Sequence, residues 1–151
     1  MKINVSSTKD LNKVFAELQR RVNVAQTTDV ATTVREEMKD QIEQVVYSVY
    51  TPDESNPDSY VRLKDDGGLT DDENIDTYMT DATTLVIESN RFDGNRNVGE
   101  VVVTGQGYNF PFAYNGVARD YVEATKDELE ATNIHVAALA RGLKKTGLQI
   151  K

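Results

Sequence analysis

The sequence predicts an α+β fold: a small antiparallel sheet packed by two N-terminal helices and a long C-terminal helix, with a long acidic loop. Apolar residues recur at helical spacing near both ends of the chain, and short runs of β-branched residues lie in its second half. Residues 51–76, between these regions, are rich in acids, proline and glycine. A length of 151 residues fits a single domain, which we expect to span residues 1–151.

Two helices are expected in the N-terminal third. A short apolar run at residues 2–6 is compatible with a strand, and Ser7 or Thr8 then offers an N-cap. The first helix follows, with an apolar stripe made of Leu11, Val14, Phe15, Leu18 and Val22. We expect Thr27 and Thr28 to cap a second helix that ends near residue 44, followed by extended chain because VVYSVY is rich in β-branched and aromatic residues.

The segment 51–76 is predicted to be a long loop, and it supplies nearly all the acidity of the chain. It holds nine acids and two bases, against a net charge of −8 for the whole protein. The Gly67-Gly68 pair indicates a turn that needs a positive φ angle. Long loops in compact domains are uncommon and are usually functional or disordered, so we expect one of these two roles for this segment.

The second half of the chain is predicted to contain strands at Thr83–Glu88 and Glu100–Thr104, with a hairpin signal at Asp93-Gly94. A loop rich in glycine and aromatic residues follows at 105–116. The final helix is expected to run from Tyr121 to about Lys145. Its seven-residue repeat favours packing on the core over a coiled-coil seam, through Val122, Leu129, Val136 and Leu143.

Composition and spacing give no positive sign of catalysis, a cofactor or a metal site. The chain has no cysteine and a single histidine, His135, which has no carboxylate three or four residues away to orient it. Gly105-x-Gly107 lacks the third glycine of a dinucleotide site, and the EF-hand-like run from Asp93 has its glycine in the wrong register. We therefore expect a protein that is not an enzyme, with no cofactor.

Charge and hydropathy also restrict the partners. A net charge of −8 disfavours nucleic-acid binding, which needs a basic face, and no apolar run is long enough to span a membrane. The start, MKINVSSTKD, lacks the apolar region of a signal peptide, so we expect use without export. Tyrosines placed at predicted loop edges suit either protein interfaces or anchorage of the loops to the core: Tyr47, Tyr50, Tyr60, Tyr78, Tyr108, Tyr114 and Tyr121.

The order of these features resembles the neck or tail-completion (head–tail joining) proteins of tailed bacteriophages, over roughly residues 28–147. The matching motifs are Val-Tyr-x-x-Tyr-x-Pro from Val46, Tyr-x-Arg from Tyr60, Gly-Gly-Leu-x-Asp-x-x-Asn-Ile from Gly67, and Ala-Arg-Asp-Tyr-Val from Ala118. The last departs from the usual Arg-Pro-Phe of that family, because Asp120 replaces the proline.

The resemblance implies a virion structural protein at the head–tail junction, made in the host cytoplasm and assembling as a homo-oligomeric ring. Its partners would be the connector or head-closure proteins and the tail tube or terminator, and DNA would pass through the lumen without sequence-specific binding. The alternatives are a tail terminator, or a small acidic adaptor or inhibitor that binds a basic protein. The interface candidates are Tyr47, Tyr50, Tyr60, Arg62, Gly67, Gly68, Leu69, Arg119 and Tyr121.

Overall fold

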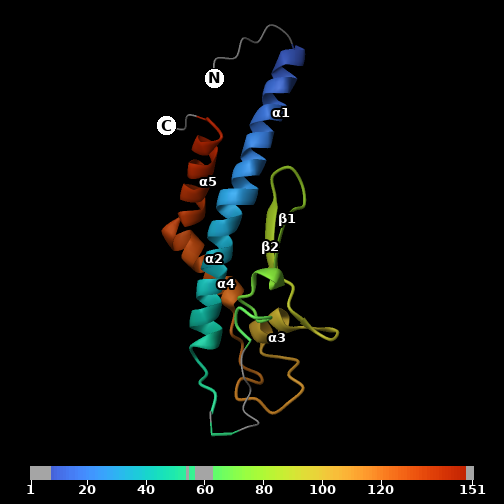
Figure 1. The fold of residues 1–151 in the computed structure, drawn as a ribbon, viewed down its shortest axis with the longest axis vertical. Helices are drawn as coiled ribbons and strands as arrows, with labels where there is room; N and C mark the ends of the chain where they lie inside the picture. Colours follow the sequence, from blue (N-terminus) through green and yellow to red (C-terminus); the bar gives the residue numbers. More distant parts are fainter. Residues whose placement is uncertain (1–7, 54, 57–62, 149–151) are drawn as a thin grey trace.

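The computed structural model describes residues 8–53, 55–56 and 63–148, and it is an elongated α+β structure (Figure 1). The expected strand at 2–6 and the interface candidates Tyr60 and Arg62 lie outside the described residues. The α+β class predicted from the sequence is confirmed. In the described part of the chain, no helix combines the length and the apolar character needed to cross a membrane.

The N-terminal helices form one continuous rod rather than two separate helices. α1 (Thr8–Ala25) passes through a π-helical turn, η1 (Gln26–Val30), into α2 (Ala31–Ile42), and a second π-helical turn, η2 (Glu43–Tyr47), ends the rod (Figure 1). The cap predicted at Thr27 and Thr28 is wrong, because both hydroxyls donate back to carbonyl oxygens, those of Asn23 (2.8 Å) and Val24 (2.6 Å) respectively. The extended chain predicted after residue 44 is also wrong, since residues 45–47 remain helical.

Two antiparallel hairpins form the sheets. β1 (Ile75–Met79) pairs with β2 (Leu85–Ser89), and β3 (Phe92–Asp93) pairs with β4 (Arg96–Asn97). The strand predicted at 83–88 corresponds to β2, and the hairpin signal at Asp93-Gly94 is confirmed. The acidic loop is shorter than predicted, because a 3₁₀ turn, η3 (Asp72–Asn74), leads directly into β1.

The strand predicted at Glu100–Thr104 is instead a helix, α3 (Val98–Thr104). The side chain of Asn97 accepts a hydrogen bond from the Glu100 amide and caps its start, and Gly105 ends it at φ 71°. The helix buries Val101 and Val102 against the core, so packing outweighs the β propensity of its valines.

The long C-terminal helix is broken in two. α4 (Tyr121–Thr132) and α5 (Ile134–Lys145) meet at Asn133, which adopts a left-handed conformation with φ 54°. The break changes which faces are buried: Val122 and Val136, predicted to pack on the core, are 40% and 52% exposed. The buried positions are instead Tyr121 and Thr125 on α4, and Ala138 and Gly142 on α5.

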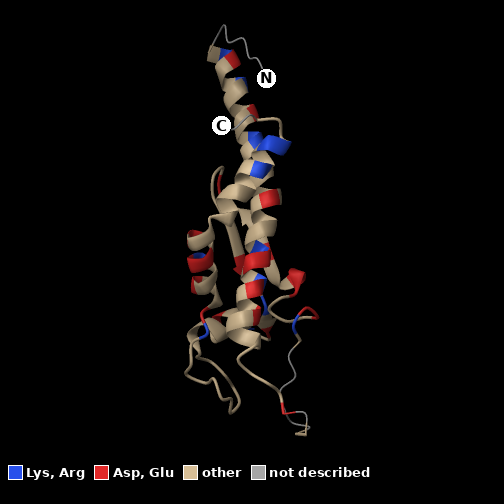
Figure 2. Ribbon diagram, turned by 90° about the vertical axis from the view of Figure 1, so that its left-hand side faces the viewer, with Lys and Arg blue, Asp and Glu red and all other residues tan. Residues whose placement is uncertain are grey.

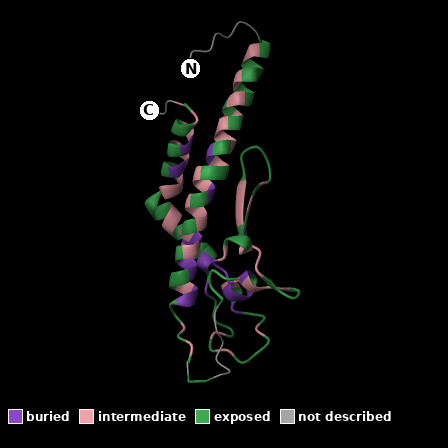
Figure 3. Ribbon diagram, in the orientation of Figure 1, coloured by how far each residue is buried: buried purple, intermediate pink, exposed green. Residues whose placement is uncertain are grey.

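The hydrophobic core lies in the half of the molecule where α2, α3 and α4 meet (Figure 3). Ile87, Val98 and Val103 pack against it. Its buried members come from the rod, the acidic segment, β1, α3 and α4: Met38, Ile42, Val46, Tyr47, Leu69, Ile75, Val102 and Tyr121.

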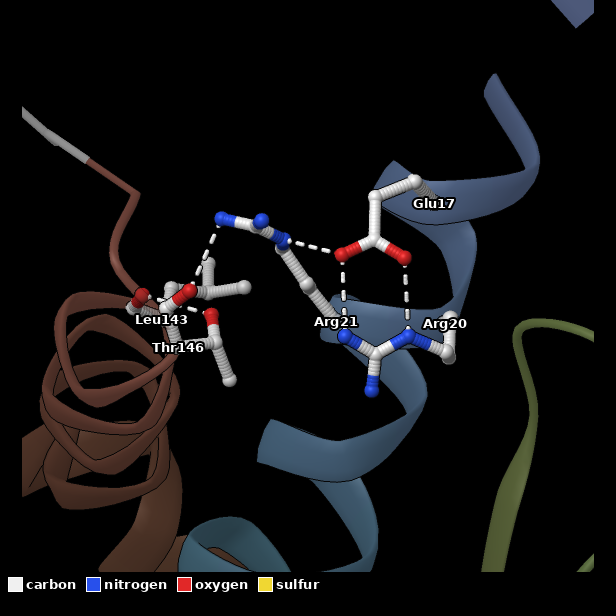
Figure 4. A network of polar contacts seen from close by, with 5 residues as sticks. All are labelled: Glu17, Arg20, Arg21, Leu143 and Thr146. Carbon is white, nitrogen blue, oxygen red and sulfur yellow. Dashed lines mark hydrogen bonds and ion pairs between the residues drawn. The ribbon is translucent and has the colours of Figure 1, made fainter. Parts of the chain in front are cut away.

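In the half of the molecule away from this core, α5 packs beside α1, and polar contacts join the two helices. Nη1 of Arg21 donates a hydrogen bond to the Thr146 carbonyl at 2.8 Å, and the same guanidinium pairs with Glu17 (Figure 4). Arg20 binds the same carboxylate. Gly142 allows this close approach, since a Cβ there would lie 2.8 Å from the Cβ of Ala25.

Candidate functional site: an arginine-lined cavity and an uncovered helix face

A cavity of about 430 Å³ opens among the loops below the core, and we call it the arginine cavity. Its walls come from the end of the rod, residues 63–69, the β3–β4 hairpin, α3, the aromatic loop 105–117 and Arg119. Of the described residues that line it, three are arginines, Arg91, Arg96 and Arg119, and one is an acid, Asp93. Its size is typical of a ligand site.

Arg119 is the most deeply buried charged group of the cavity, at 6% exposed. Its amide donates to the carbonyl of Val102 at 3.0 Å, which fixes its backbone against α3. The guanidinium lies over the ring of Tyr114, with Cζ 4.6 Å from the ring centroid, and 5.6 Å from that of Phe112. It donates to the hydroxyl of Tyr108 and, at 3.4 Å, to the Val46 carbonyl. Its buried Nε has no hydrogen-bond partner in the part of the chain that the structure describes.

The other two arginines come from the β3–β4 hairpin region. Nη2 of Arg96 pairs with Asp93 at 2.7 Å, and its Nη1 donates to the Gly107 carbonyl at 3.2 Å. Nη1 of Arg91 donates to the carbonyl of Phe92. Among the described residues, neither Arg91 nor Arg119 has an acidic partner within ion-pair distance, so the cavity lining carries an excess of positive charge.

Aromatic rings build the wall next to Arg119. Phe112 lies at the centre of the group, with centroids 5.2 Å from Tyr108, 5.6 Å from Phe110 and 5.6 Å from Tyr114. Tyr50 meets Phe112 edge to face at 5.4 Å. The aromatic loop is closed by a backbone hydrogen bond of 2.6 Å from the amide of Gly116 to the carbonyl of Gly105. Phe112 thus contacts Tyr50, which follows the rod, as well as Arg119.

Residues 63–69, at the end of the acidic segment, also line the cavity, and they are anchored to the core. Leu69 is buried, and its amide donates to the hydroxyl of Tyr47 at 2.9 Å. Gly67 has φ 77°, as its predicted turn requires, whereas Gly68 is needed for space, because a Cβ there would lie 2.2 Å from the Lys64 carbonyl oxygen. Amides of Glu73 and Gly67 donate to the Asp71 carboxylate and lower its pKa.

Most of the described interface candidates gather at this cavity. Tyr47, Gly67, Gly68, Leu69 and Arg119 line it, and Tyr50 contacts its aromatic wall.

Tyr121 does not line the cavity. It is 1% exposed in the core, where burial raises the pKa of its hydroxyl. A tyrosine so deeply buried is an anchor of the fold and not a surface contact.

Sequence reasoning missed Arg91, Arg96, Phe110 and Phe112 as cavity residues. Their signal was present, because the two arginines flank the Asp93-Gly94 hairpin and the phenylalanines lie in the aromatic loop. Nothing in the sequence indicated that these two loops meet.

The described residues hold no group of three or more acidic or histidine side chains placed to bind a metal ion. His135 is half-buried on α5, and its Nδ1 has no hydrogen-bond partner within residues 8–53, 55–56 and 63–148.

A second feature is the apolar stripe of α1, defined here as Leu11, Phe15 and Leu18. These side chains are 41%, 63% and 36% exposed, although their spacing places them on one helix face. The first turns of α1 extend beyond the end of α5 (Figures 1 and 3). Of the five residues predicted to face the core, these three are therefore exposed, whereas Val14 and Val22 are half-buried.

Comparison with known proteins identifies a family and gives no further relative. The family model of YomN matches residues 8–145, so the chain belongs to the YomN family, a phage-derived protein family. No curated protein and no solved structure matches the chain.

Proposed function

We propose that this YomN family protein is a non-catalytic structural protein of the phage particle, which assembles as a homo-oligomeric ring at the head–tail junction. The ring would join the tail to the portal or connector and contact the head-closure and tail-tube or terminator proteins. The phage-derived family supports a role in a phage. The observation that carries assembly is the uncovered apolar stripe of α1.

An exposed row of large apolar side chains on a projecting helix favours a protein partner. Apolar patches of this kind mark interaction surfaces, and a helix with little packing of its own is only marginally stable in water. Figure 3 shows the upper turns of α1 as exposed and intermediate, whereas buried residues gather at the lower end of the rod and at α3. Covering Leu11, Phe15 and Leu18 would therefore stabilise the helix as well as the assembly.

Charge favours a second copy of this chain as the partner. α1 carries four basic and two acidic residues, a net charge of +2, so the rest of a chain of net −8 carries −10. Lys and Arg gather where α1 and the end of α5 lie together, whereas acidic side chains predominate in the other half (Figure 2). A basic helix from one copy is thus complementary to the acidic half of another. Such a contact is heterologous, because it joins two different surfaces of the chain, and heterologous contacts form rings when the rotation between copies closes.

Substitutions in the stripe test this proposal. The double variant Leu11→Ser, Phe15→Ser should sediment as a monomer at concentrations where the wild type forms oligomers. The variant should still unfold in one cooperative transition, which shows that the monomer remains folded. Val136→Ser is the matched control, because Val136 is 52% exposed on a different helix, and it should leave assembly unchanged. Equal assembly of the wild type and the double variant in analytical ultracentrifugation would refute the role of α1.

The place of the protein in the particle needs a separate experiment. Gold-labelled antibody against the chain should bind purified phage particles at the head–tail junction. Label that stays with separated tails would indicate the tail terminator instead. Absence from the particle, with a monomer that associates only with a basic protein, would indicate the acidic adaptor.

A further inference from the structure

We propose that the arginine cavity binds a carboxylate group carried on an apolar or aromatic body. This proposal goes beyond the ring assembly and does not depend on it, because the cavity and the apolar stripe of α1 are different surfaces. Arg91, Arg96 and Arg119 would hold the carboxylate, and the aromatic wall would hold the body.

The charge of the cavity lining favours an anionic ligand. The described lining of the cavity has three guanidinium groups and one carboxylate, in a protein whose net charge is −8. Asp93 satisfies only Arg96, through a 2.7 Å ion pair. Within the described residues, Arg91 and Arg119 have no acidic partner. A local excess of positive charge in a concave site of an acidic protein indicates an anionic ligand.

The environment of Arg119 leaves its buried charge without a counter-charge. A buried guanidinium is costly unless its charge is balanced and its N–H groups are satisfied. Arg119 is 6% exposed and is stabilised by two neutral hydrogen bonds and two aromatic rings, but no described residue accepts a hydrogen bond from its Nε. A ligand carboxylate would supply the missing counter-charge, in the bidentate geometry that arginine favours.

The aromatic and valine side chains of the lining favour a ligand with an apolar body. Tyr108, Phe110 and Phe112 line the cavity. Valines of the rod and of α3 also line it, among them Val46 and Val101. The volume of about 430 Å³ accommodates a single aromatic or branched apolar group together with its carboxylate. A bare inorganic anion would leave this surface uncovered.

The acidity of the whole molecule disfavours a polyanion in this site. Nucleic acid requires a basic face to replace its counterions, and the surroundings of the cavity include the acidic segment. A single carboxylate meets the local positive charge without bringing further negative charge against that segment. It could come from a peptide of a neighbouring protein or from a small carboxylic acid.

Calorimetric titration of the full chain with 4-phenylbutyrate tests the proposal. We expect saturable binding at millimolar concentrations. The uncharged 4-phenylbutanol and inorganic phosphate should each bind at least about tenfold more weakly, because each lacks one of the two recognised parts. Equal binding of the alcohol, equal binding of phosphate, or no binding of 4-phenylbutyrate would each overturn the proposal.

Variants locate the binding. Arg119→Gln and Arg96→Gln should each weaken 4-phenylbutyrate about tenfold, and Arg96→Gln keeps the test valid if the buried Arg119 is needed for folding. Arg20→Gln is the control, because Arg20 is an exposed arginine on α1, and binding should be unchanged. Binding that none of the cavity variants weakens would place the ligand elsewhere and refute the site.

A second probe distinguishes the two sources of the carboxylate. The blocked tripeptide acetyl-Phe-Glu-Leu-amide presents an acidic side chain between apolar ones. Tighter binding of the tripeptide than of 4-phenylbutyrate would support a peptide ligand from a partner protein. The reverse order would support a small carboxylic acid.

Discussion

The amide of Leu69 donates a hydrogen bond of 2.9 Å to the hydroxyl of Tyr47, and both residues are buried. This contact joins the last turn of the helical rod to the acidic segment, and it forms one corner of the arginine cavity. This contact explains why the acidic segment is anchored near Leu69. The Leu69 side chain packs in the core, and the Tyr47 hydroxyl accepts the hydrogen bond of the Leu69 amide.

Tyr47→Phe should lower the free energy of unfolding by about 1–3 kcal/mol, because the buried Leu69 amide would lose its partner. Urea unfolding followed by circular dichroism measures this change. Tyr78→Phe is the matched control: its hydroxyl bonds Glu88 at 2.8 Å on the surface, so the change should stay within about 0.5 kcal/mol. Equal effects of the two substitutions would contradict the role given to the Tyr47 hydroxyl.

Gly142→Ala should destabilise the protein by about 1–3 kcal/mol, although alanine is the better helix former. The new Cβ would lie 2.8 Å from the Cβ of Ala25 and 3.0 Å from its Cα, so α1 and α5 would have to separate. Thermal unfolding measures the effect. A raised melting temperature would show that the two helices do not approach this closely.

Asn133 should tolerate glycine but not valine. Its φ of 54° lies in the left-handed region, where a β-branched residue is strained by about 1–2 kcal/mol. We expect Asn133→Gly to retain stability within about 0.5 kcal/mol, and Asn133→Val to lose about 1–2 kcal/mol in urea unfolding. A valine variant with higher helix content and undiminished stability would indicate that α4 and α5 can form one straight helix.

The Glu17 carboxyl should titrate at about pH 2 rather than 4.5, because hydrogen bonds from Arg20 and Arg21 favour its ionised form (Figure 4). A pKa lowered on folding stabilises the native state above the unfolded value. We therefore expect this contribution to be complete above pH 4.5 and to disappear as the pH falls to about 2. NMR titration of the carboxyl carbon measures the pKa directly.

Arg20→Gln and Arg21→Gln should each move the Glu17 pKa back toward 4.5. Asp81 is the internal control, since its pKa of about 2 comes from hydrogen bonds with Thr83 and Thr84. It should not change in either variant. A Glu17 pKa that stays low in both variants would show that another group stabilises the carboxylate.

Local sequence signals predicted the elements whose cause is local. The helical stripes, the β2 strand, the Asp93-Gly94 turn and the positive φ at Gly67 were all recognisable, and the α+β class followed from them. Where local preference and tertiary packing disagree, the prediction was wrong. Residues 100–104 have strong β propensity, yet they form part of α3 because the cap at Asn97 and burial of Val101 and Val102 favour a helix.

Two further errors have physical causes that the sequence only partly reveals. Thr27 and Thr28 can cap a helix or bond back to the preceding turn, and only the continuous rod selects the second geometry. β1 was missed because its exposed Asp76 resembled the acidic loop, although Ile75, Thr77 and Met79 alternate as a half-buried strand should. The arginine cavity depends on contacts between segments that lie far apart in the chain, which no local pattern encodes.

Light scattering of the wild-type chain over a range of concentrations, with negative-stain images of the same fractions, tests the central claim of self-assembly most directly. We expect a mass that rises with concentration to a fixed multiple of the chain mass, and ring-shaped particles in the images. A single-chain mass at every concentration, with no rings, would contradict it.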